Sequence, residues 1–315
     1  MKGIGFHRRI TRRLRALAYT VCCYLLTFSG AVAGAPIENI LILKSNDNRF
    51  FNTSIEHLIN QTRSQVKFNI ENVENLDANP PSFERAELII TLGIKAAEYL
   101  EYSTKDIPVI HSYITEFQYR QHASHPHHYA VLLDQPPQRY LAFIDALLGS
   151  GKIAILSTEN SRLPDSALEP ADTRTSGRVQ QQLYASKDNL INAIRDLLMD
   201  NDVLLSLPDP QIYNQQSLKG ILLTSYRQNK PVISYSPAHV KSGALAAIYA
   251  SPQQIGDQVA GLVNKFLTDP DYRPEASYYA SDFTITINQR VANSLQLDIP
   301  DIETLQKNLK KGLSQ

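Results

Sequence analysis

Three groups of residues in this chain could carry chemistry, and the first is a glycine-rich segment. Gly149-Ser150-Gly151-Lys152 resembles the end of a phosphate-binding loop, in which backbone N–H groups hold phosphate oxygens. However, Ile153 stands where such a loop needs Ser or Thr for magnesium, and the segment precedes a strand instead of joining a strand to a helix. The motifs G-x-G-x-x-G, H-E-x-x-H and G-x-S-x-G do not occur. We therefore expect no enzymatic activity and no cofactor.

The other two groups are a cluster of histidines and a pair of cysteines. His122, His125, His127 and His128 surround Pro126 closely enough to suggest a transition-metal site. No carboxylate or Cys completes a metal-ligand pattern there, so a polar loop is the favoured interpretation and no metal is expected. Cys22 and Cys23 are the only cysteines of the chain, and both lie near its N-terminus.

The N-terminus has the pattern of a secretory signal peptide. Six basic side chains precede the first acidic residue, Glu38, and residues 16–33 carry no charge. The small residues Ala31-Val32-Ala33 predict cleavage before Gly34, so the signal peptide would span residues 1–33. A single transmembrane anchor is the alternative, because the uncharged stretch is almost long enough to span a bilayer. A lipoprotein is disfavoured, since the residues before Cys22 do not fit a lipid-attachment site.

Removal of this leader would change the composition of the protein. The whole chain has 31 basic and 31 acidic side chains, and six of the basic ones belong to the leader. The remaining chain is mildly acidic and contains no cysteine, so it has neither a disulfide nor a thiol nucleophile. Without a basic excess it is not expected to bind nucleic acid. The sequence thus predicts an exported, periplasmic protein.

Beyond the leader, short apolar runs alternate with segments of helical periodicity. Near-continuous apolar runs suit strands that are buried on both faces of a parallel sheet. Residues 190–198 instead have apolar side chains spaced three and four apart, which indicates an amphipathic helix. Alternating strands and helices predict βαβ units and an α/β fold with open sheets covered on both sides. The predicted strands lie at residues 40–43, 87–92, 108–112, 152–156, 202–207 and 231–235.

The predicted strands recur in the same order in the two halves of the chain. Residues 40–46 resemble residues 153–160. Likewise, the pair 87–93 and 107–113 resembles the pair 202–208 and 230–236. One interpretation is two Rossmann-like open-sheet lobes; the other is the general likeness of any two α/β domains. Two lobes would bring the carboxyl ends of their strands, where open sheets bind ligands, to a cleft between them.

Four sets of segments together carry a resemblance to a known family. They are Leu132-Leu133-Asp134-Gln135-Pro136, Leu204-Leu205-Ser206-Leu207-Pro208-Asp209-Pro210 with Tyr213-Asn214, Leu222-Leu223-Thr224-Ser225-Tyr226-Arg227, and Ser234-Tyr235-Ser236 with Lys241-Ser242-Gly243-Ala244-Leu245-Ala246. These segments resemble the uncharacterised periplasmic substrate-binding components of ABC transporters, a family that is related to tryptophan-binding proteins and has the type I periplasmic binding fold. The resemblance is strongest over residues 202–267. It implies a first lobe at residues 37–132 with a return segment at roughly 245–275, and a second lobe at 133–235 with part of 276–315.

The resemblance implies that loops after the strands hold the ligand. Gly93 opens a helix whose free N–H groups suit a carboxylate, although Ile94 replaces the small hydroxyl residue that is frequent there in the family. Two tyrosines end equivalent strands and would flank a planar ligand, while an aspartate and an asparagine would fix an amine. Helix capping by the aspartate and burial of the tyrosines in the core are the alternatives. The predicted ligand-binding residues are Ser45, Asn46, Gly93, Tyr113, Asp134, Asp209, Asn214, Tyr235 and Ser236.

The function that the resemblance implies is solute binding. The protein would close on a small solute by hinge motion, and would deliver it to an ABC permease in the inner membrane. The tyrosines and aspartates suit an amino-bearing or aromatic solute. Two other functions stay open. One is an extracytoplasmic sensory or partner-binding module that presents ligand to a membrane receptor. The other is a periplasmic hydrolase, for which the sequence offers no pair of nucleophile and base.

Overall fold

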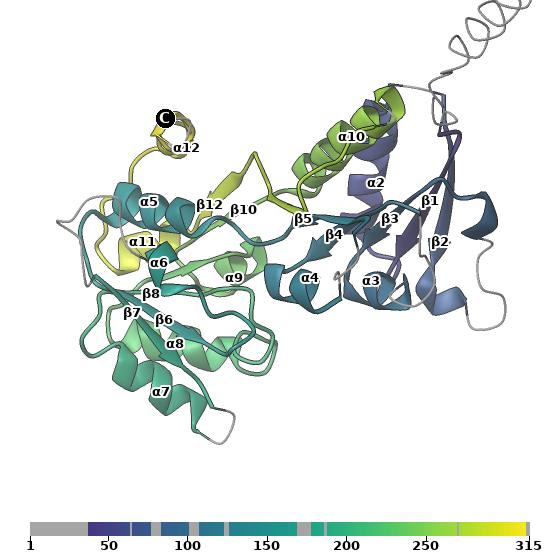
Figure 1. The fold of residues 1–315 in the computed structure, drawn as a ribbon. Coiled ribbons are helices and arrows are strands. Elements are labelled where there is room, and N and C mark those ends of the chain that lie inside the picture. Colours follow the sequence, from purple (N-terminus) through teal and green to yellow (C-terminus); the bar gives the residue numbers. More distant parts are fainter. Residues whose placement is uncertain are drawn as a thin grey trace, which may run out of the picture.

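The computed structural model describes residues 37–63, 65–76, 83–100, 107–122, 126–168, 178–185, 188–269 and 271–312. The predicted signal peptide and its cleavage site lie outside the described residues, as does His125. The described chain forms two α/β lobes, each built around a six-stranded sheet (Figure 1). The predicted fold class is therefore confirmed. In the described ranges, no helix is long and apolar enough to cross a membrane.

The first lobe contains a sheet with strand order β11-β5-β4-β3-β1-β2. All neighbouring strands in this sheet pair in parallel. Its inner strands are buried on both faces, which explains why their sequences are continuous apolar runs without alternation. The strands are β1 (Asn39–Lys44), β2 (Lys67–Asn72), β3 (Leu88–Leu92), β4 (Val109–Ile114), β5 (His128–Leu132) and β11 (Ser277–Tyr279).

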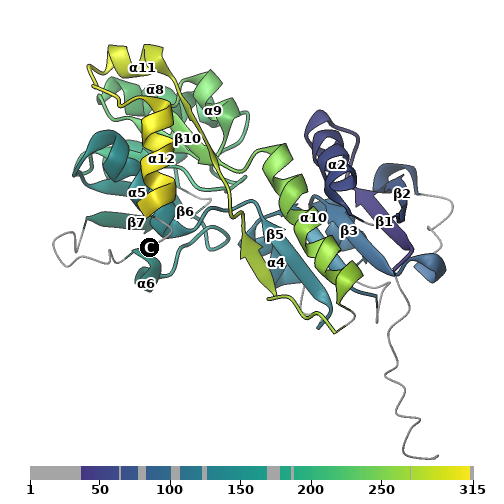
Figure 2. The ribbon, with the colours of Figure 1, turned by 90° about the horizontal axis from the view of Figure 1, so that it is seen from above.

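Helices cover both faces of the first sheet (Figures 1 and 2). On one face, α2 (Arg49–Gln61) lies beside α10 (Pro252–Thr268), and their apolar sides form one core cluster with β1, β3 and β4. Gly256 of α10 allows this close approach, because a Cβ there would collide with the backbone of Ser54. The other face is covered by α3 (Ile94–Leu100) and α4 (Glu116–His122).

The second lobe repeats the strand order of the first, with the sheet β12-β10-β9-β8-β6-β7. Counted from the opposite edge, β1, β3 and β4 correspond to β6, β8 and β9, as the repeated sequence segments predicted. The two sheets differ at one edge, because β12 pairs antiparallel with β10 whereas β11 pairs parallel with β5. The strands are β6 (Ile153–Ser157), β7 (Val179–Leu183), β8 (Val203–Leu205), β9 (Val232–Ser234), β10 (Ala246–Tyr249) and β12 (Thr284–Ile287).

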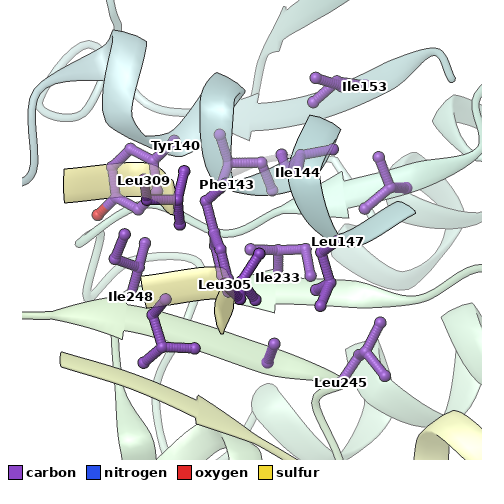
Figure 3. Packing of buried hydrophobic residues seen from close by; sticks show 14 of the residues in the cluster. Tyr140, Phe143, Ile144, Leu147, Ile153, Ile233, Leu245, Ile248, Leu305 and Leu309 are labelled. Carbon is purple, nitrogen blue, oxygen red and sulfur yellow. The ribbon is translucent and has the colours of Figure 1, made fainter. Parts of the chain in front are cut away.

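The core of the second lobe lies on both sides of its sheet. On one face, α5 (Pro137–Leu148) packs with α12 (Ile302–Gly312), and Figure 3 shows Tyr140 and Phe143 of α5 against Leu305 and Leu309 of α12. Pro137 starts α5, a position where the missing N–H of proline costs nothing. The opposite face is covered by α7 (Leu190–Leu197), α8 (Leu218–Arg227) and α9 (Pro237–Ser242), while α6 (Asp165–Leu168) and α11 (Gln289–Ser294) are short peripheral helices.

Three connections join the two sheets. They are residues 133–136 between β5 and α5, residues 250–251 between β10 and α10, and residues 280–283 between β11 and β12. Consequently the C-terminal part of the first lobe covers α10 and β11, whereas the sequence placed it at roughly 245–275. The approximate bounds came from the resemblance, and a pattern of apolar residues does not show which sheet a strand joins. The division into domains itself stays a prediction.

Candidate functional site

The site that the fold defines lies at the carboxyl ends of the strands. All three connections start there, from the ends of β5, β10 and β11, so these ends of both sheets border the connections. Parallel open sheets bind ligands at this edge. The predicted ligand-binding residues lie in the loops after β1, β3, β5, β8 and β9 or, for Tyr113, near the end of β4. The hydrogen bonds of each residue show which of its polar groups are already used within the protein.

In the first lobe, Ser45 and Gly93 form a tight pair. The Oγ of Ser45 accepts a hydrogen bond from the backbone N–H of Ala96 at 3.0 Å and so caps α3. Gly93 has φ +91°, and a Cβ there would lie 2.6 Å from this Oγ, so only glycine fits. The N–H of Gly93 donates to the carbonyl of Ser112 at 2.9 Å. Two N–H groups predicted to receive a ligand carboxylate are therefore already bonded within the protein.

Asn46 belongs to a polar turn between β1 and α2. Its Oδ1 accepts a hydrogen bond from Nδ2 of Asn48 at 2.6 Å. The Oδ1 of Asn48 in turn accepts from the N–H of Phe51 and caps α2. Asn46 is half-buried. Its side-chain amide also carries two N–H donors, and these are the groups that would bind a ligand. Its role in binding stays a prediction.

Tyr113 has an unusual backbone conformation, with φ +58°. For a non-glycine residue this conformation costs of order 1–2 kcal/mol, so the surroundings must hold it in place. Ser54 donates its proton to the carbonyl of Pro252, and its Oγ lies 2.6 Å from the hydroxyl of Tyr113, which is therefore the donor of that bond. The ring packs edge-on against Phe51 at 4.9 Å. Burial raises the pKa of Tyr113 to about 12, so the hydroxyl stays neutral.

Next to Tyr113 lies Phe50, which the sequence analysis missed. Its side chain is 59% exposed although it is large and apolar, and its carbonyl lies 3.4 Å from the Tyr113 hydroxyl. Apolar periodicity marks residues that face a core, and Phe50 faces away from it. An aromatic residue at the start of α2, directly after a polar turn, was the only sequence feature that pointed to it.

Asp134 is the half-buried carboxylate of the first connection. Its Oδ2 accepts one hydrogen bond, at 2.7 Å, from the N–H of Glu116 at the start of α4. Burial raises the pKa of Asp134 to about 6, and the nearby carboxylate of Glu116 acts in the same direction. Glu116 itself accepts a 2.6 Å hydrogen bond from the hydroxyl of Tyr279 in β11. Asp134 is thus an ionisable group with little compensation for its charge.

In the second lobe, Asp209 has the opposite character. It is 1% exposed, and its Oδ2 accepts hydrogen bonds from the N–H and the Oγ1 of Thr158 and from Oγ of Ser161, at 2.5–3.0 Å. Its Oδ1 accepts from the N–H of Gln211 at 2.9 Å. With four donors, this carboxylate fastens the loop after β6 to the loop after β8. The contact of Asp209 with a ligand amine stays a prediction.

Asn214 and Ser236 also act on their own backbone. The Oδ1 of Asn214 accepts from the N–H groups of Gln216 and Ser217, and its Nδ2 donates to the carbonyl of Pro210. Ser236 caps α9 by accepting from the N–H of Ala238 at 3.3 Å. Asn214 lies just before α8, whose N-cap is Ser217, and Ser236 is itself the N-cap of α9, so both residues hold the chain at a helix start.

Tyr235 directly follows β9, whereas Tyr113 lies near the end of the corresponding strand β4, one position further along in the sequence repeat. Its ring meets that of His239 edge-on at 5.0 Å. Burial raises the pKa of Tyr235 to about 12, and the charge of Asp209 contributes to this shift.

Two further tyrosines extend this group, and the sequence analysis did not identify them as site residues. Burial raises the pKa of Tyr140 in α5, as do the charges of Asp134 and Tyr235. Burial also raises the pKa of Tyr213, with contributions from Asp209 and Tyr235. Asp134 and Asp209 thus each act electrostatically on one of these two tyrosines, and Tyr235 acts on both. Among the described residues, the buried hydroxyl of Tyr213 has no hydrogen-bond partner.

The pair Ser234 and His239 is the nearest approach to a catalytic arrangement. The Oγ of Ser234 lies 2.8 Å from Nδ1 of His239 and 3.1 Å from Oγ of Ser206. Ser234 is 0% exposed, so a substrate cannot reach its oxygen. Burial lowers the pKa of His239, which keeps the ring neutral. The pair therefore serves as a buried polar link between β8, β9 and α9.

The predicted histidine cluster divides in the structure. His128 is buried in β5, where its Nδ1 lies 3.1 Å from Nε2 of His111, and the other ring nitrogen of His111 lies 2.8 Å from Oγ1 of Thr91. Burial, with the charges of His128 and His122, lowers the pKa of His111 to about 3. His122 instead faces Glu98 on the surface at 3.7 Å. Within the described part of the chain, no three His, Cys, Asp or Glu side chains are placed to hold a metal ion.

Comparison with known proteins gives matches among solved structures. The sequence matches no family model and no curated protein. The ligand-free, open structure of a substrate binding protein with adhesive properties from Clostridium difficile has a TM-score of 0.67 at 16% identity, covering 85% of this chain and 97% of that chain. An ABC domain from Streptococcus pneumonia in complex with L-Trp has a TM-score of 0.58 at 18% identity, covering 85% and 98%. A periplasmic ribose ABC transporter from Conexibacter woesei has a TM-score of 0.52 at 13% identity, covering 89% and 100%.

These likenesses define the class of fold. The chain has the two-lobed type I periplasmic binding fold, which the resemblance of its sequence implied. Its structural neighbours are substrate-binding proteins of ABC transporters.

Proposed function

We propose that this protein is an exported solute-binding protein that closes its two lobes around a small molecule. The observation that carries the proposal is the pair of sheets with the same strand order, joined by three connections that all leave carboxyl ends of strands. This arrangement supports a hinge beside the edges of the two sheets, where open sheets bind ligands. Solute binding would favour the closed form by contacting both lobes at once, and no chemical step is required.

The uneven satisfaction of the two carboxylates supports a solute that carries an amine. Asp134 has a single hydrogen bond from another residue, and its raised pKa reflects a charge that lacks a partner. A ligand cation beside it would supply that partner. Asp209 has four donors and no comparable need. Tyr113, Tyr235 and the exposed Phe50 provide aromatic surface for a planar part of the same solute.

The first experiment is a thermal-shift screen followed by calorimetric titration. The panel contains aromatic amino acids, aromatic amines, nucleosides, sugars and organic acids. We expect the melting temperature to rise with an aromatic amine or amino acid, because a ligand that binds only the folded state stabilises it. A flat response to the whole panel, with no effect of site variants, would contradict solute binding.

The second experiment tests the carboxylate. Asp134→Asn is expected to weaken binding of the best amine by about 30-fold or more, because the charge of the ligand then lacks its partner. The matched control is Asp200→Asn, an exposed aspartate of the second lobe. In the unchanged protein, affinity should fall about tenfold per pH unit below pH 6, since only the ionised carboxylate attracts the amine. If Asp134→Asn binds normally and keeps this pH dependence, the amine lies elsewhere.

We further propose an ABC permease of the inner membrane as the partner. Co-purification from membranes distinguishes it from the other candidate, an extracytoplasmic module that presents ligand to a receptor. Recovery of permease subunits in a solute-dependent manner is the expected result. Recovery of a receptor kinase or cyclase instead would favour the sensory function.

A further inference from the structure

The third connection, residues 280–283, is held from both lobes. From the second lobe, Nη1 of Arg139 donates to the carbonyl of Ala280 at 2.7 Å, and Nη2 lies 3.5 Å from the carbonyl of Ser281. From the first lobe, Gln258 of α10 accepts hydrogen bonds from the N–H and the Oγ of Ser281, at 2.8 and 3.1 Å. The amide nitrogen of Gln258 also donates to the carbonyl of Tyr279 at 3.1 Å.

Arg139 also holds the first connection. Its Nη1 donates to Oε1 of Gln135 at 2.6 Å, and both side chains are buried. The guanidinium stacks over Phe283 with its central carbon 4.9 Å from the ring centroid. Among the described residues Arg139 forms no ion pair, and the nearby Asp282 is paired with Lys310 at 2.6 Å. Burying a guanidinium that has no carboxylate in ion-pair contact is costly, even with the charge of Asp282 nearby, so packing alone does not account for an arginine here.

The second connection is joined to the third by Gln254, one turn before Gln258 on the same helix. Its Oε1 accepts from the N–H of Ser251 at 2.8 Å and from Oγ1 of Thr284 at 3.1 Å. Ser251 belongs to the second connection, and Thr284 starts the strand that follows the third. All three connections are therefore linked by side chains of α5 and α10. Figure 2 shows these two helices on either side of the connections.

We propose that Arg139 and Gln258 form a two-sided clamp on the third connection, which makes the three connections bend as one hinge. Three separate chain segments with independent backbone torsions would allow the lobes many relative orientations. The clamp limits them to one path, so less orientational freedom is lost when the lobes close on a solute. Arg139 and Gln258 are positioning residues in this scheme. The clamp depends on the hinge closure proposed above, but it can be measured without any solute.

The test measures the distance between the lobes in solution. The full chain, with Cys22→Ser and Cys23→Ser, receives spin labels at Glu56→Cys on α2 and Asn192→Cys on α7, two exposed positions. Double electron–electron resonance then gives the distribution of distances between the labels. We expect one narrow distribution in this parent chain. Arg139→Met keeps an apolar stem against Phe283 but removes the guanidinium, and we expect it to lose the narrow distribution.

Gln258→Leu removes the grip from the other lobe and should broaden the distribution in the same way. Gln258 is half-buried on a helix surface, so we expect Gln258→Leu to fold. If Arg139→Met does not fold, the distance distribution of Gln258→Leu alone decides the test. Gln138→Met and Gln253→Leu, exposed neighbours on α5 and α10, are the matched controls and should keep the narrow distribution. A purely structural role would lower the unfolding midpoint without widening the distribution. A parent-like distribution in either folded variant would overturn the clamp.

Discussion

The two lobes share a strand order but use their carboxylates in opposite ways. Asp209 in the second lobe accepts four hydrogen bonds and is almost completely buried. Asp134, at the exit from the first sheet, accepts one hydrogen bond from another residue and has a pKa raised to about 6. The number of donors around a carboxylate, not its place after a strand, decides whether it holds the protein together or is available to a ligand.

Removing the saturated carboxylate should have the largest effect. Asp209→Ala leaves four donors of Thr158, Ser161 and Gln211 without their acceptor, two of them buried and two part-buried, and we expect the free energy of unfolding to fall by about 3–5 kcal/mol. Urea unfolding followed by circular dichroism measures this change. Asp200→Ala, at an exposed position of the same lobe, should change it by no more than about 0.5 kcal/mol. Equal effects of the two variants would show that the four hydrogen bonds of Asp209 do not stabilise the fold, and would remove its contrast with Asp134.

Two glycines with positive φ, one in each lobe, allow a second comparison of the two lobes. Gly93 in the first lobe has φ +91° and no room for a Cβ, whereas Gly149 in the second has φ +73° and open space around it. Gly149→Ala should cost about 1–2 kcal/mol from backbone strain alone. Gly93→Ala adds the collision with Ser45, and we expect a total of about 2–4 kcal/mol. Unfolding midpoints of both variants provide the measurement, and a larger loss for Gly149→Ala would contradict the geometry.

The smallest expected effect concerns the free energy of unfolding, which the ionised and buried carboxylate of Asp134 lowers at neutral pH. Its folded-state pKa of about 6 lies above the ordinary 3.8, so its ionised form opposes folding above pH 6 and this cost disappears as the pH falls through 6 to 4. Asp134→Asn should therefore raise the melting temperature by about 2–4 °C at pH 7.

The same variant should melt like the unchanged protein at pH 4, and the control Asp200→Asn should show no difference at either pH. A lower melting temperature of Asp134→Asn at pH 7 would show that the carboxylate is needed for the fold. A variant that melts at a higher temperature but binds its solute less well would instead show that the carboxylate of Asp134 serves solute binding at a cost in stability.

Much of the fold follows from the sequence because its strands are local and apolar. The runs at residues 40–43 and 153–156 became β1 and β6, and the repeated segments became corresponding strands of the two sheets. The sheet membership of the last strands did not follow from the sequence, because β10, β11 and β12 are short and the pairs β11–β5 and β12–β10 join segments far apart in the sequence. A pattern of apolar residues predicts a strand, but only long-range pairing assigns it to a lobe.

The candidate site was predicted less fully than the fold. Residue type and position identified Asp134, Tyr113 and Tyr235 as ends of strands. The donors that saturate Asp209 come from Thr158 and Ser161, 51 and 48 residues away, and no local pattern reveals them.

By itself, the sequence determined the alternation of strands and helices, the repeat and the residues that end each strand, because these depend on local spacing and hydrophobicity. The tertiary structure alone decided which carboxylate accepts four hydrogen bonds and which tyrosines are buried under the influence of Asp134 and Asp209. It also decided that Arg139 reaches a connection 141 residues further along the chain. Such properties depend on burial and on partners from distant segments, and both exist only once the chain has folded.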